Sequence, residues 1–209
     1  MNRTEKTISA YDNSAQQFAD RFMDFETYKN KINYFQHNYL ANGKSILDLG
    51  CGPGNNAKLF SEADGTYEIT GIDLSEKMVD LAKTNVPKGN FTVCDIRDFR
   101  FNQSFDAVIA SFCIVHLTHA EASSFIKNTC EHLKNGGYLY VSFMEGEGSG
   151  FESTGFSKNE IFFNYFNRSE IIEFLNHCSM EVTEIFEEMY IEKNGDKTKD
   201  IFIIARKLI

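Results

Sequence analysis

The chain has 209 residues and a mass of 23.9 kDa, a length that suits a single domain with a large hydrophobic core. Its formal net charge is −9, from 30 acidic and 21 basic residues, whereas proteins that bind phosphate backbones draw on Lys and Arg. No apolar stretch reaches the length of a membrane span, and no signal peptide is recognisable. We therefore expect a cytoplasmic protein with no nucleic-acid partner and no membrane partner.

Residues 1–42 carry no strand pattern, and we predict that they form a helical cap. Aromatic and aliphatic residues recur there at helical spacing, which indicates two helices packed against the ligand-binding face. The recurring residues are Phe18, Phe22, Tyr28, Ile32, Phe35, Tyr39 and Leu40. Core packing and a role as a cover over the reacting centre both fit this pattern.

Residues 46–54 read Ile-Leu-Asp-Leu-Gly-Cys-Gly-Pro-Gly, an apolar strand that runs into a turn with glycine at every second position. Glycine lets the backbone bend sharply and lets a ligand approach the main chain, and the following helix directs free N–H groups at that ligand. A dinucleotide fingerprint would need a small residue where Asn55 stands, and a phosphate loop would need Gly-Lys-Ser/Thr after the turn. The turn therefore predicts a nucleotide-like cofactor of another type.

A second strand pattern, residues 67–73, ends at Asp73, whose carboxylate is placed to accept hydrogen bonds from both hydroxyls of a ribose. Ser75 is predicted to cap the next helix, which carries Met78 on its apolar face and stops before Pro87. A solvated acidic cap on that helix is the alternative interpretation of Asp73.

Three further strand patterns follow, over residues 91–96, 104–112 and 133–143, with helical patterns between them. This alternation from Lys44 onward implies crossover connections and a mainly parallel, doubly wound sheet.

Two helices in the second half of the chain are predicted by capping boxes, Thr118 with Glu121 and Asn167 with Glu170. The end of the chain then shows two strand patterns joined by an Asn-Gly-Asp turn at 194–196. We expect an antiparallel hairpin at the edge of the sheet.

Residues 145–166 are first rich in glycine and then in aromatic residues, and we expect them to form a lid over a substrate. Core packing is the alternative for each of the rings. The rings are those of Phe151, Phe156, Phe162, Phe163, Tyr165 and Phe166.

Taken in order from Lys44 to Phe143, these elements resemble the class I S-adenosylmethionine-dependent methyltransferases of the small-molecule type. The first motif of that family reads acidic-x-Gly-x-Gly-x-Gly, which Asp48 and the three glycines match. The resemblance implies an α/β fold, with a doubly wound, seven-stranded, mainly parallel sheet of the Rossmann-like methyltransferase type and a C-terminal antiparallel hairpin. It also implies S-adenosyl-L-methionine as the cofactor and S-adenosyl-L-homocysteine as the product.

No linker, repeat or second domain is visible in the chain. We therefore expect one methyltransferase domain over residues 1–209. Between the helical cap and the lid lies the expected cofactor-binding core, residues 43–144, and a C-terminal helix and hairpin are expected over 167–209.

The resemblance also implies roles for individual residues. Asp95 and Ile96 would hold the adenine, and Tyr11 would lie at the carboxylate end of the cofactor, with plain packing as the alternative for Tyr11. The full set of predicted cofactor-binding residues is Tyr11, Asp48, Gly50, Cys51, Gly52, Gly54, Asp73, Leu74, Met78, Asp95, Ile96 and Ser111.

Motifs that are missing after the fourth strand pattern exclude several classes of methyl acceptor. Residues 110–113 read Ala-Ser-Phe-Cys. They do not resemble the Asn/Asp-Pro-Pro-Tyr of amino-group methylation, the Pro-Cys of cytosine carbon methylation, or the Asp of magnesium-dependent enzymes. We expect metal-independent, in-line transfer to an oxygen or nitrogen of a small molecule. The rival interpretations are a non-catalytic S-adenosylmethionine-binding sensor or partner subunit, and an NAD-binding oxidoreductase.

His116 is the titratable residue best placed for proton transfer, because it follows a strand whose carboxyl end should border the ligand. A catalytic general base and a structural residue beside the cofactor are its two interpretations. Cys113, His116 and His119 are three residues apart, but a helix beginning at Thr118 would separate their faces, so we expect no metal ion. Five cysteines without disulfide or zinc spacing indicate reduced thiols. No sequence pattern indicates the oligomeric state.

Overall fold

The computed structural model describes residues 2–40, 44–63, 66–191, 195 and 197–209. Its helices are α1 (Arg3–Asn13), α2 (Ala15–Phe22), α3 (Glu26–Tyr39), α4 (Asn55–Glu62), α5 (Glu76–Asn85), α6 (His119–Glu131) and α7 (Arg168–His177), with one 3₁₀ turn, η1 (Ile114–His116). Its strands are β1 (Ser45–Leu49), β2 (Glu68–Asp73), β3 (Asn90–Val93), β4 (Phe105–Ser111), β5 (Leu133–Glu145), β6 (Ser149–Glu152), β7 (Ile161–Asn164), β8 (Met180–Ile191) and β9 (Lys197–Lys207). In this part of the chain, no helix is both long enough and apolar enough to cross a membrane.

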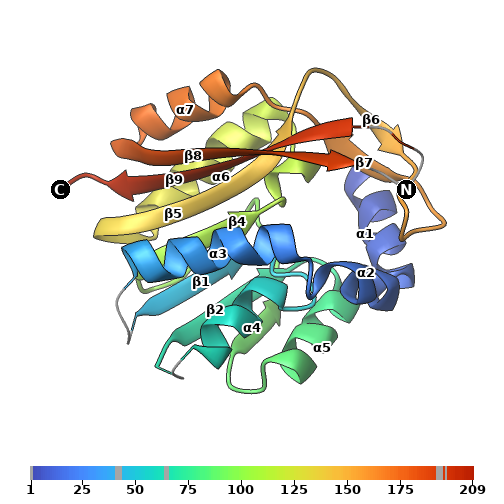
Figure 1. The fold of residues 1–209 in the computed structure, drawn as a ribbon, viewed down its shortest axis with the longest axis horizontal. Helices are drawn as coiled ribbons and strands as arrows, with labels where there is room; N and C mark the ends of the chain where they lie inside the picture. Colours follow the sequence, from blue (N-terminus) through green and yellow to red (C-terminus); the bar gives the residue numbers. More distant parts are fainter. Residues whose placement is uncertain (1, 41–43, 64–65, 192–194, 196) are drawn as a thin grey trace.

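A seven-stranded sheet forms the centre of the molecule, in the order β3-β2-β1-β4-β5-β9-β8 (Figure 1). Neighbouring strands from β3 to β5 run parallel, whereas β9 runs antiparallel to both β5 and β8. The prediction of a doubly wound, mainly parallel sheet with a C-terminal antiparallel hairpin is confirmed. Of the predicted hairpin turn, Asn194 and Asp196 lie outside the described residues, and Gly195 has a φ of +92°.

Helices cover both faces of this sheet, with α3, α4 and α5 on one face and α6 and α7 on the other (Figure 1). Successive side chains of β1 alternate between the faces: Ile46 packs in the core beneath α3 and α4, and Leu47 packs in the core beneath α6. Both are buried, as expected for a parallel strand that is covered on two sides. Because these strands run parallel, the loops that follow them lie together at the carboxyl-terminal end of the sheet.

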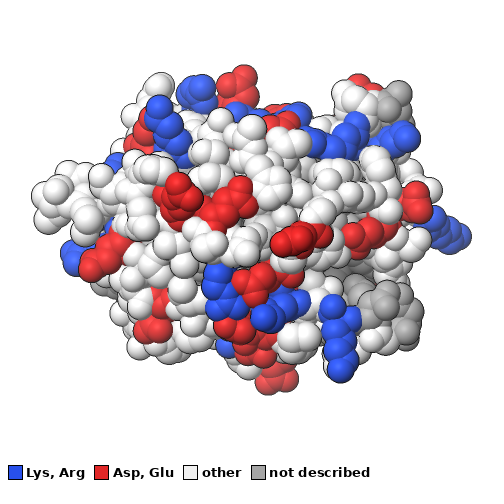
Figure 2. All heavy atoms as spheres, turned by 90° about the horizontal axis from the view of Figure 1, so that it is seen from above, with Lys and Arg blue, Asp and Glu red and all other residues white. Residues whose placement is uncertain are grey.

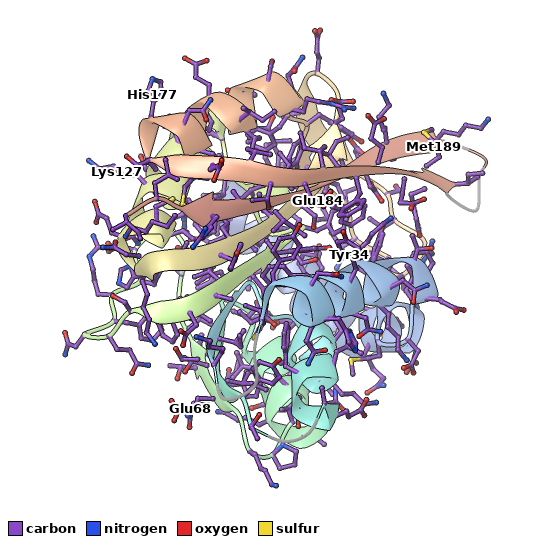
Figure 3. All side chains as sticks on the ribbon, turned by 60° about the vertical axis from the view of Figure 1, so that its left-hand side comes forward. Tyr34, Glu68, Lys127, His177, Glu184 and Met189 are labelled. Atoms are coloured by element: carbon purple, nitrogen blue, oxygen red, sulfur yellow. The ribbon has the colours of Figure 1, made fainter. Side chains whose placement is uncertain are left out.

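Strand β8 forms an edge of the sheet, and alternate side chains along it are exposed. Tyr34 and Tyr39 of α3 both donate a hydrogen bond to Oε1 of Glu184 on this strand, at 3.2 and 3.1 Å. Figure 3 labels Tyr34 and Glu184 on these two elements. Met189, near the other end of the strand, is 55% exposed (Figure 3). The two tyrosines thus attach helix α3 to the edge strand.

The N-terminal part of the chain forms three helices, α1, α2 and α3, where two were predicted. The additional boundary lies at Ser14, which has a φ of −129° and a ψ of 20° and whose hydroxyl donates to the carbonyl oxygen of Ala10 at 2.6 Å. Such local side-chain bonds compete with helical bonding. Helices α1 and α2 lie at the same end of the molecule as β6 and β7 (Figure 1), and the N–H group of Phe162 donates to Thr7 Oγ1 of α1 at 3.3 Å.

The two predicted capping boxes have different outcomes. Thr118 and Glu121 form a capping box at the start of α6, as predicted. At the start of α7, Asn167 caps the helix by accepting a backbone N–H group two residues further on, at 3.0 Å. The carboxylate of Glu170 does not close a box there but lies 2.7 Å from Nδ1 of His119 on α6. That half of the prediction is wrong, because a tertiary partner competes for the side chain.

The segment 145–166 contains a small antiparallel sheet of β6 and β7, which its composition did not indicate. Strand β6 is four residues long and contains Gly150, so its hydrophobic alternation is too short to recognise. The role of this segment as a lid stays a prediction.

Candidate functional site

A cavity of about 460 Å³ lies where the parallel strands of the sheet end. It is lined by residues at the ends of β1, β2 and β4, by residues of α1 and α2, and by the segment 152–156. Ligands of open α/β sheets bind at this edge, and the volume lies in the range of small-molecule pockets. The cavity is therefore the candidate site.

The turn after β1 is held in shape by hydrogen bonds from its own N–H groups. Those of Gly50 and Cys51 both donate to the carbonyl oxygen of Ile72 on β2, at 2.8 and 2.9 Å. The N–H group of Gly52 donates to Oδ2 of Asp73 at 2.9 Å. The backbone reaches this shape with a φ of +68° at Gly50 and +53° at Gly52, values that favour glycine.

The three glycines of the turn have different neighbours. A Cβ atom at Gly50 would lie 2.5 Å from Cβ of Cys113, and one at Gly54 would lie 3.2 Å from Cα of Ala82 on α5. A Cβ atom at Gly52 would have its nearest neighbour among the described residues at 3.7 Å. Gly52 is therefore the glycine whose main chain is open to a ligand in the cavity.

The carboxylate of Asp73 borders the cavity and also belongs to the turn. Its Oδ2 accepts from Gly52, and its Oδ1 accepts from the N–H group of Ser75 at 2.9 Å. Burial raises the pKa of Asp73 in spite of these backbone donors, which favour the charged form. Each carboxylate oxygen can accept more than one hydrogen bond, so the group remains able to receive ligand hydroxyls. Ser75 caps α5, as predicted.

Asp95 lines the cavity, but its carboxylate already accepts hydrogen bonds from Arg97. Nε of Arg97 lies 3.0 Å from both carboxylate oxygens of Asp95. Nη1 of Arg97 also lies 3.2 Å from Oε1 of Glu121. Although burial acts to raise it, the hydrogen bonds from Arg97 leave the pKa of Asp95 below its usual value. The predicted adenine amino group would have to share this carboxylate with Arg97.

His116 lies in η1, and both of its ring nitrogens are hydrogen-bonded. Nδ1 lies 2.8 Å from the carbonyl oxygen of Phe162, and Nε2 lies 3.0 Å from the hydroxyl of Tyr11. Because a carbonyl oxygen only accepts, Nδ1 carries the proton and Nε2 accepts from the hydroxyl. Tyr11 keeps its proton, since burial and then the charge of Asp73 raise its pKa.

Burial lowers the pKa of His116 to about 4. The imidazole is therefore neutral at pH 7, and its unprotonated nitrogen is occupied by Tyr11. The role of His116 as a catalytic base stays a prediction, and the geometry favours the structural alternative, because Nε2 is already hydrogen-bonded to the hydroxyl of Tyr11. Within the described residues, no group of three or more His, Cys, Asp and Glu side chains is arranged to hold a metal ion.

Most of the predicted cofactor-binding residues meet at the cavity. Those that line it are Tyr11, Gly50, Gly52, Asp73, Leu74, Met78, Asp95, Ile96 and Ser111, together with the candidate base His116. Asp48, Cys51 and Gly54 are not part of the lining. Cys51 packs in the core beneath the turn, and Asp48 is buried, which raises the pKa of its carboxyl to about 7. Asp48, Cys51 and Gly54 therefore present no surface to the cavity.

Some aromatic side chains of the segment 145–166 line the cavity, and others do not. Phe156, Phe163 and Tyr165 line the cavity, whereas Phe151, Phe162 and Phe166 do not. The ring of Phe156 stacks on Tyr11 with 5.9 Å between centroids and contacts Phe18 at 5.1 Å. The segment thus packs against α1 and α2 over the cavity.

The cavity also contains residues that the sequence analysis did not select. Phe112, directly after β4, has a φ of +52°, which is strained for a bulky side chain, and its N–H group lies 3.1 Å from both the carbonyl and the hydroxyl oxygen of Ser142. Asp200 is 2% exposed and accepts a hydrogen bond from the hydroxyl of Tyr28 at 2.7 Å. A lone carboxylate directly before the buried apolar run 201–205 was the sequence signal for it.

Part of the chain is similar in sequence to known methyltransferases. Residues 46–137 match the family described as a methyltransferase domain. The dTDP-3-amino-3,4,6-trideoxy-alpha-D-glucopyranose N,N-dimethyltransferase of Streptomyces venezuelae is 33% identical over 99 residues, which make up 46% of this chain and 41% of that protein. The chain spans less than half the length of the curated relatives it matches.

Solved structures resemble this chain over most of its length. A SAM-dependent methyltransferase from Methanosarcina mazei is 26% identical with a TM-score of 0.72, over 83% of this chain and 96% of that chain. The 1,6-didemethyltoxoflavin-N1-methyltransferase of Burkholderia thailandensis, crystallised with 1,6-didemethyltoxoflavin and S-adenosylhomocysteine, is 17% identical. Its TM-score is 0.73, over 100% of this chain and 92% of that chain, a likeness of fold alone.

Replacing Gly50 by Ala should destabilise the protein, because the new Cβ atom would collide with Cys113 while the residue keeps its φ of +68°. We expect the free energy of unfolding, measured by urea denaturation, to fall by about 2–4 kcal/mol. The matched variant is Gly52→Ala, where the φ alone is unfavourable and about 1–2 kcal/mol should be lost. Equal losses in the two variants would contradict the different surroundings of these glycines.

The buried, neutral state of His116 should appear as a pH dependence of stability. Its pKa lies near 4 in the folded chain and near 6.5 in the unfolded chain, so the unfolded chain binds more protons between these values. The free energy of unfolding should therefore decrease as the pH falls from 6.5 towards 4, with about 1–2 kcal/mol of the loss by pH 5 due to this residue. Urea denaturation of His116→Gln should lack that part of the decrease. An imidazole NMR titration midpoint near 6.5 would contradict this assignment.

Proposed function

We propose that this chain, which belongs to the class I S-adenosylmethionine-dependent methyltransferase family, transfers a methyl group from S-adenosyl-L-methionine to an oxygen or nitrogen of a small molecule. The reaction is metal-independent, proceeds by in-line displacement and releases S-adenosyl-L-homocysteine. The observation that carries the proposal is the open main chain of Gly52 beside the carboxylate of Asp73, in a cavity of about 460 Å³.

The residues of the cavity fit the cofactor of this family. Gly52 leaves space where any other residue would place a Cβ atom, and Asp73 offers lone pairs to the ribose hydroxyls. Leu74, Met78 and Ile96 supply apolar surface for the adenine. The cofactor supplies a methyl group on a positively charged sulfur, which needs no further activation.

The task left to the protein is to position the reactants and exclude water. Helices α1 and α2 contribute Tyr11, Phe18 and Phe22 to the lining and so cover the cavity. His116 acts here as a positioning residue, because its Nε2 fixes the hydroxyl of Tyr11. Holding the reacting atoms in line lowers the barrier by several kcal/mol.

A small molecule is the partner that this proposal requires. Acidic and basic side chains are interspersed on the face of the molecule that Figure 2 shows. This face shows no continuous basic strip of the kind that binds a phosphate backbone. The absence of a nucleic-acid partner and a cytoplasmic location stay predictions from the composition.

The proposal is tested by incubating the protein with S-adenosylmethionine and a panel of metabolites and measuring S-adenosylhomocysteine. We expect product with at least one small-molecule acceptor and none without an acceptor, because the methyl group needs a nucleophile. A protein that binds S-adenosylhomocysteine but forms none with any acceptor would be a binding protein, and the catalytic proposal would fail.

Variants of Asp73 provide the control in the same assay. Asp73→Ala removes the carboxylate that would accept the ribose hydroxyls and leaves the N–H group of Gly52 without its acceptor. The KM for S-adenosylmethionine should therefore rise by an amount equivalent to about 2–4 kcal/mol. Asp98→Asn removes an exposed carboxylate outside the cavity and should leave the KM unchanged. An unchanged KM in Asp73→Ala would place the cofactor elsewhere.

A further inference from the structure

A second hollow, of about 550 Å³, lies where helices α6 and α7 end, and we call it the α6–α7 hollow. Lys127 of α6 and His177 of α7, which Figure 3 labels, belong to its lining. So do Cys130 and Cys178. Among the described residues, none lines both this hollow and the cavity of the candidate site. Two cysteines thus border a surface hollow that the methyl transfer does not use.

The end of strand β9 holds together the two segments that carry these cysteines. Cys130 lies in the last turn of α6, and Cys178 directly follows α7. Nζ of Lys207, the last residue of β9, donates to the carbonyl oxygen of Cys130 at 2.7 Å. The N–H group of the next residue, Leu208, donates to the carbonyl oxygen of Ser179 at 3.0 Å. The ends of the two helices therefore meet at the same point of the sheet.

The two thiols are neighbours at this point. Cys130 is 4% exposed and belongs to the core beneath α6, and the half-buried Cys178 packs against the same core. Burial raises the pKa of the Cys130 thiol, and the neighbouring thiol of Cys178 raises it further, whereas the charge of Lys207 acts to lower it. Both cysteines are free thiols. They form a reduced pair in which Cys178 is the more accessible member.

We propose that Cys130 and Cys178 are a modification site, where a small disulfide of the glutathione type entering the α6–α7 hollow converts them into a reversible protein disulfide. This bond would tie the end of α6 to the end of α7. A disulfide carries no charge, so it suits these apolar surroundings better than a thiolate does. The inference goes beyond the proposed function and does not depend on the reaction that the chain catalyses.

The exchange takes two steps and passes through a mixed disulfide. The Cys178 thiol loses its proton to water, and its sulfur bonds to one sulfur of the small disulfide as the S–S bond of that molecule breaks and a thiolate leaves. The sulfur of Cys130, after losing its own proton, then displaces the second small thiolate from Cys178. The thiolates take up the two protons, so two protein thiols are oxidised and one small disulfide is reduced to two thiols.

The new bond should stabilise the fold. It closes residues 130–178 into a loop that contains β5, β6, β7 and α7. Closing a long loop restricts the unfolded chain more than the folded one. We expect the melting temperature of the oxidised chain to exceed that of the reduced chain by at least about 5 °C.

The test incubates the full, folded chain with oxidised glutathione in the absence of denaturant. The remaining thiols are then alkylated, and linked peptides are identified by mass spectrometry after proteolysis. We expect one link, between the peptides that contain Cys130 and Cys178, and we expect dithiothreitol to remove it. A folded chain in which these two cysteines stay unlinked, with or without glutathione attached to Cys178, would overturn the proposal. A link that forms only after unfolding in urea would overturn it as well.

Variants separate this pair from the other thiols. Cys178→Ser should lose both the link and the rise in melting temperature on treatment with oxidised glutathione. The matched control is Cys94→Ser, which removes another half-buried thiol, outside the α6–α7 hollow, and should keep both. The peptide analysis of the parent chain stands even if Cys178→Ser does not fold. An equal rise in melting temperature in treated, folded Cys178→Ser would contradict stabilisation by this bond.

Discussion

Two hydrogen bonds to the carboxylate of Asp73 hold the glycine turn and the start of α5 in place, and the rest of the cavity is built around them. One bond comes from Gly52 and the other from Ser75, whose hydroxyl lies 2.6 Å from Oδ1 of Asp12 on α1. The same short segment therefore connects the turn, the second crossover helix and the N-terminal helices. The carboxylate accepts backbone donors on both oxygens, which offsets the cost of placing a charge in a partly buried position.

The cavity has two ends with different chemistry. Around Gly52 and Asp73, the main chain and a carboxylate offer a polar cradle with apolar side chains beside it. At the other end, the rings of Tyr28 and Phe112 line the cavity together with a second carboxylate, that of Asp200. The strained backbone of Phe112 lies between them, directly after the central strand β4, and its ring contacts Tyr28. The two chemically different ends thus belong to one cavity at the carboxyl-terminal end of the parallel strands.

The parts of the fold that the sequence predicted are those with local causes. The alternation of strand and helix patterns, the glycine turn and the Asn-Gly-Asp turn at 194–196 all follow from residues close together in the chain. They predicted the sheet, the position of the cavity and the C-terminal hairpin, respectively. The helix break depends on the hydroxyl of Ser14 reaching Ala10, and β7 is held by a contact with α1, so neither was predicted.

The same distinction applies to the site. Gly52 and Asp73 were predicted because the motif carries them, but the motif does not tell which of its residues face the cavity. That is decided by distant neighbours such as Cys113, which fills the space beside Gly50. Asp200 was missed because its partner, Tyr28, is 172 residues away in the chain.

The central claim is that the space beside Gly52 and Asp73 holds S-adenosylmethionine. Titration calorimetry of the full chain with S-adenosylhomocysteine tests it most directly, with NAD as the competing ligand. We predict saturable binding of S-adenosylhomocysteine and no heat with NAD. Saturable binding of NAD without any response to S-adenosylhomocysteine would contradict the claim.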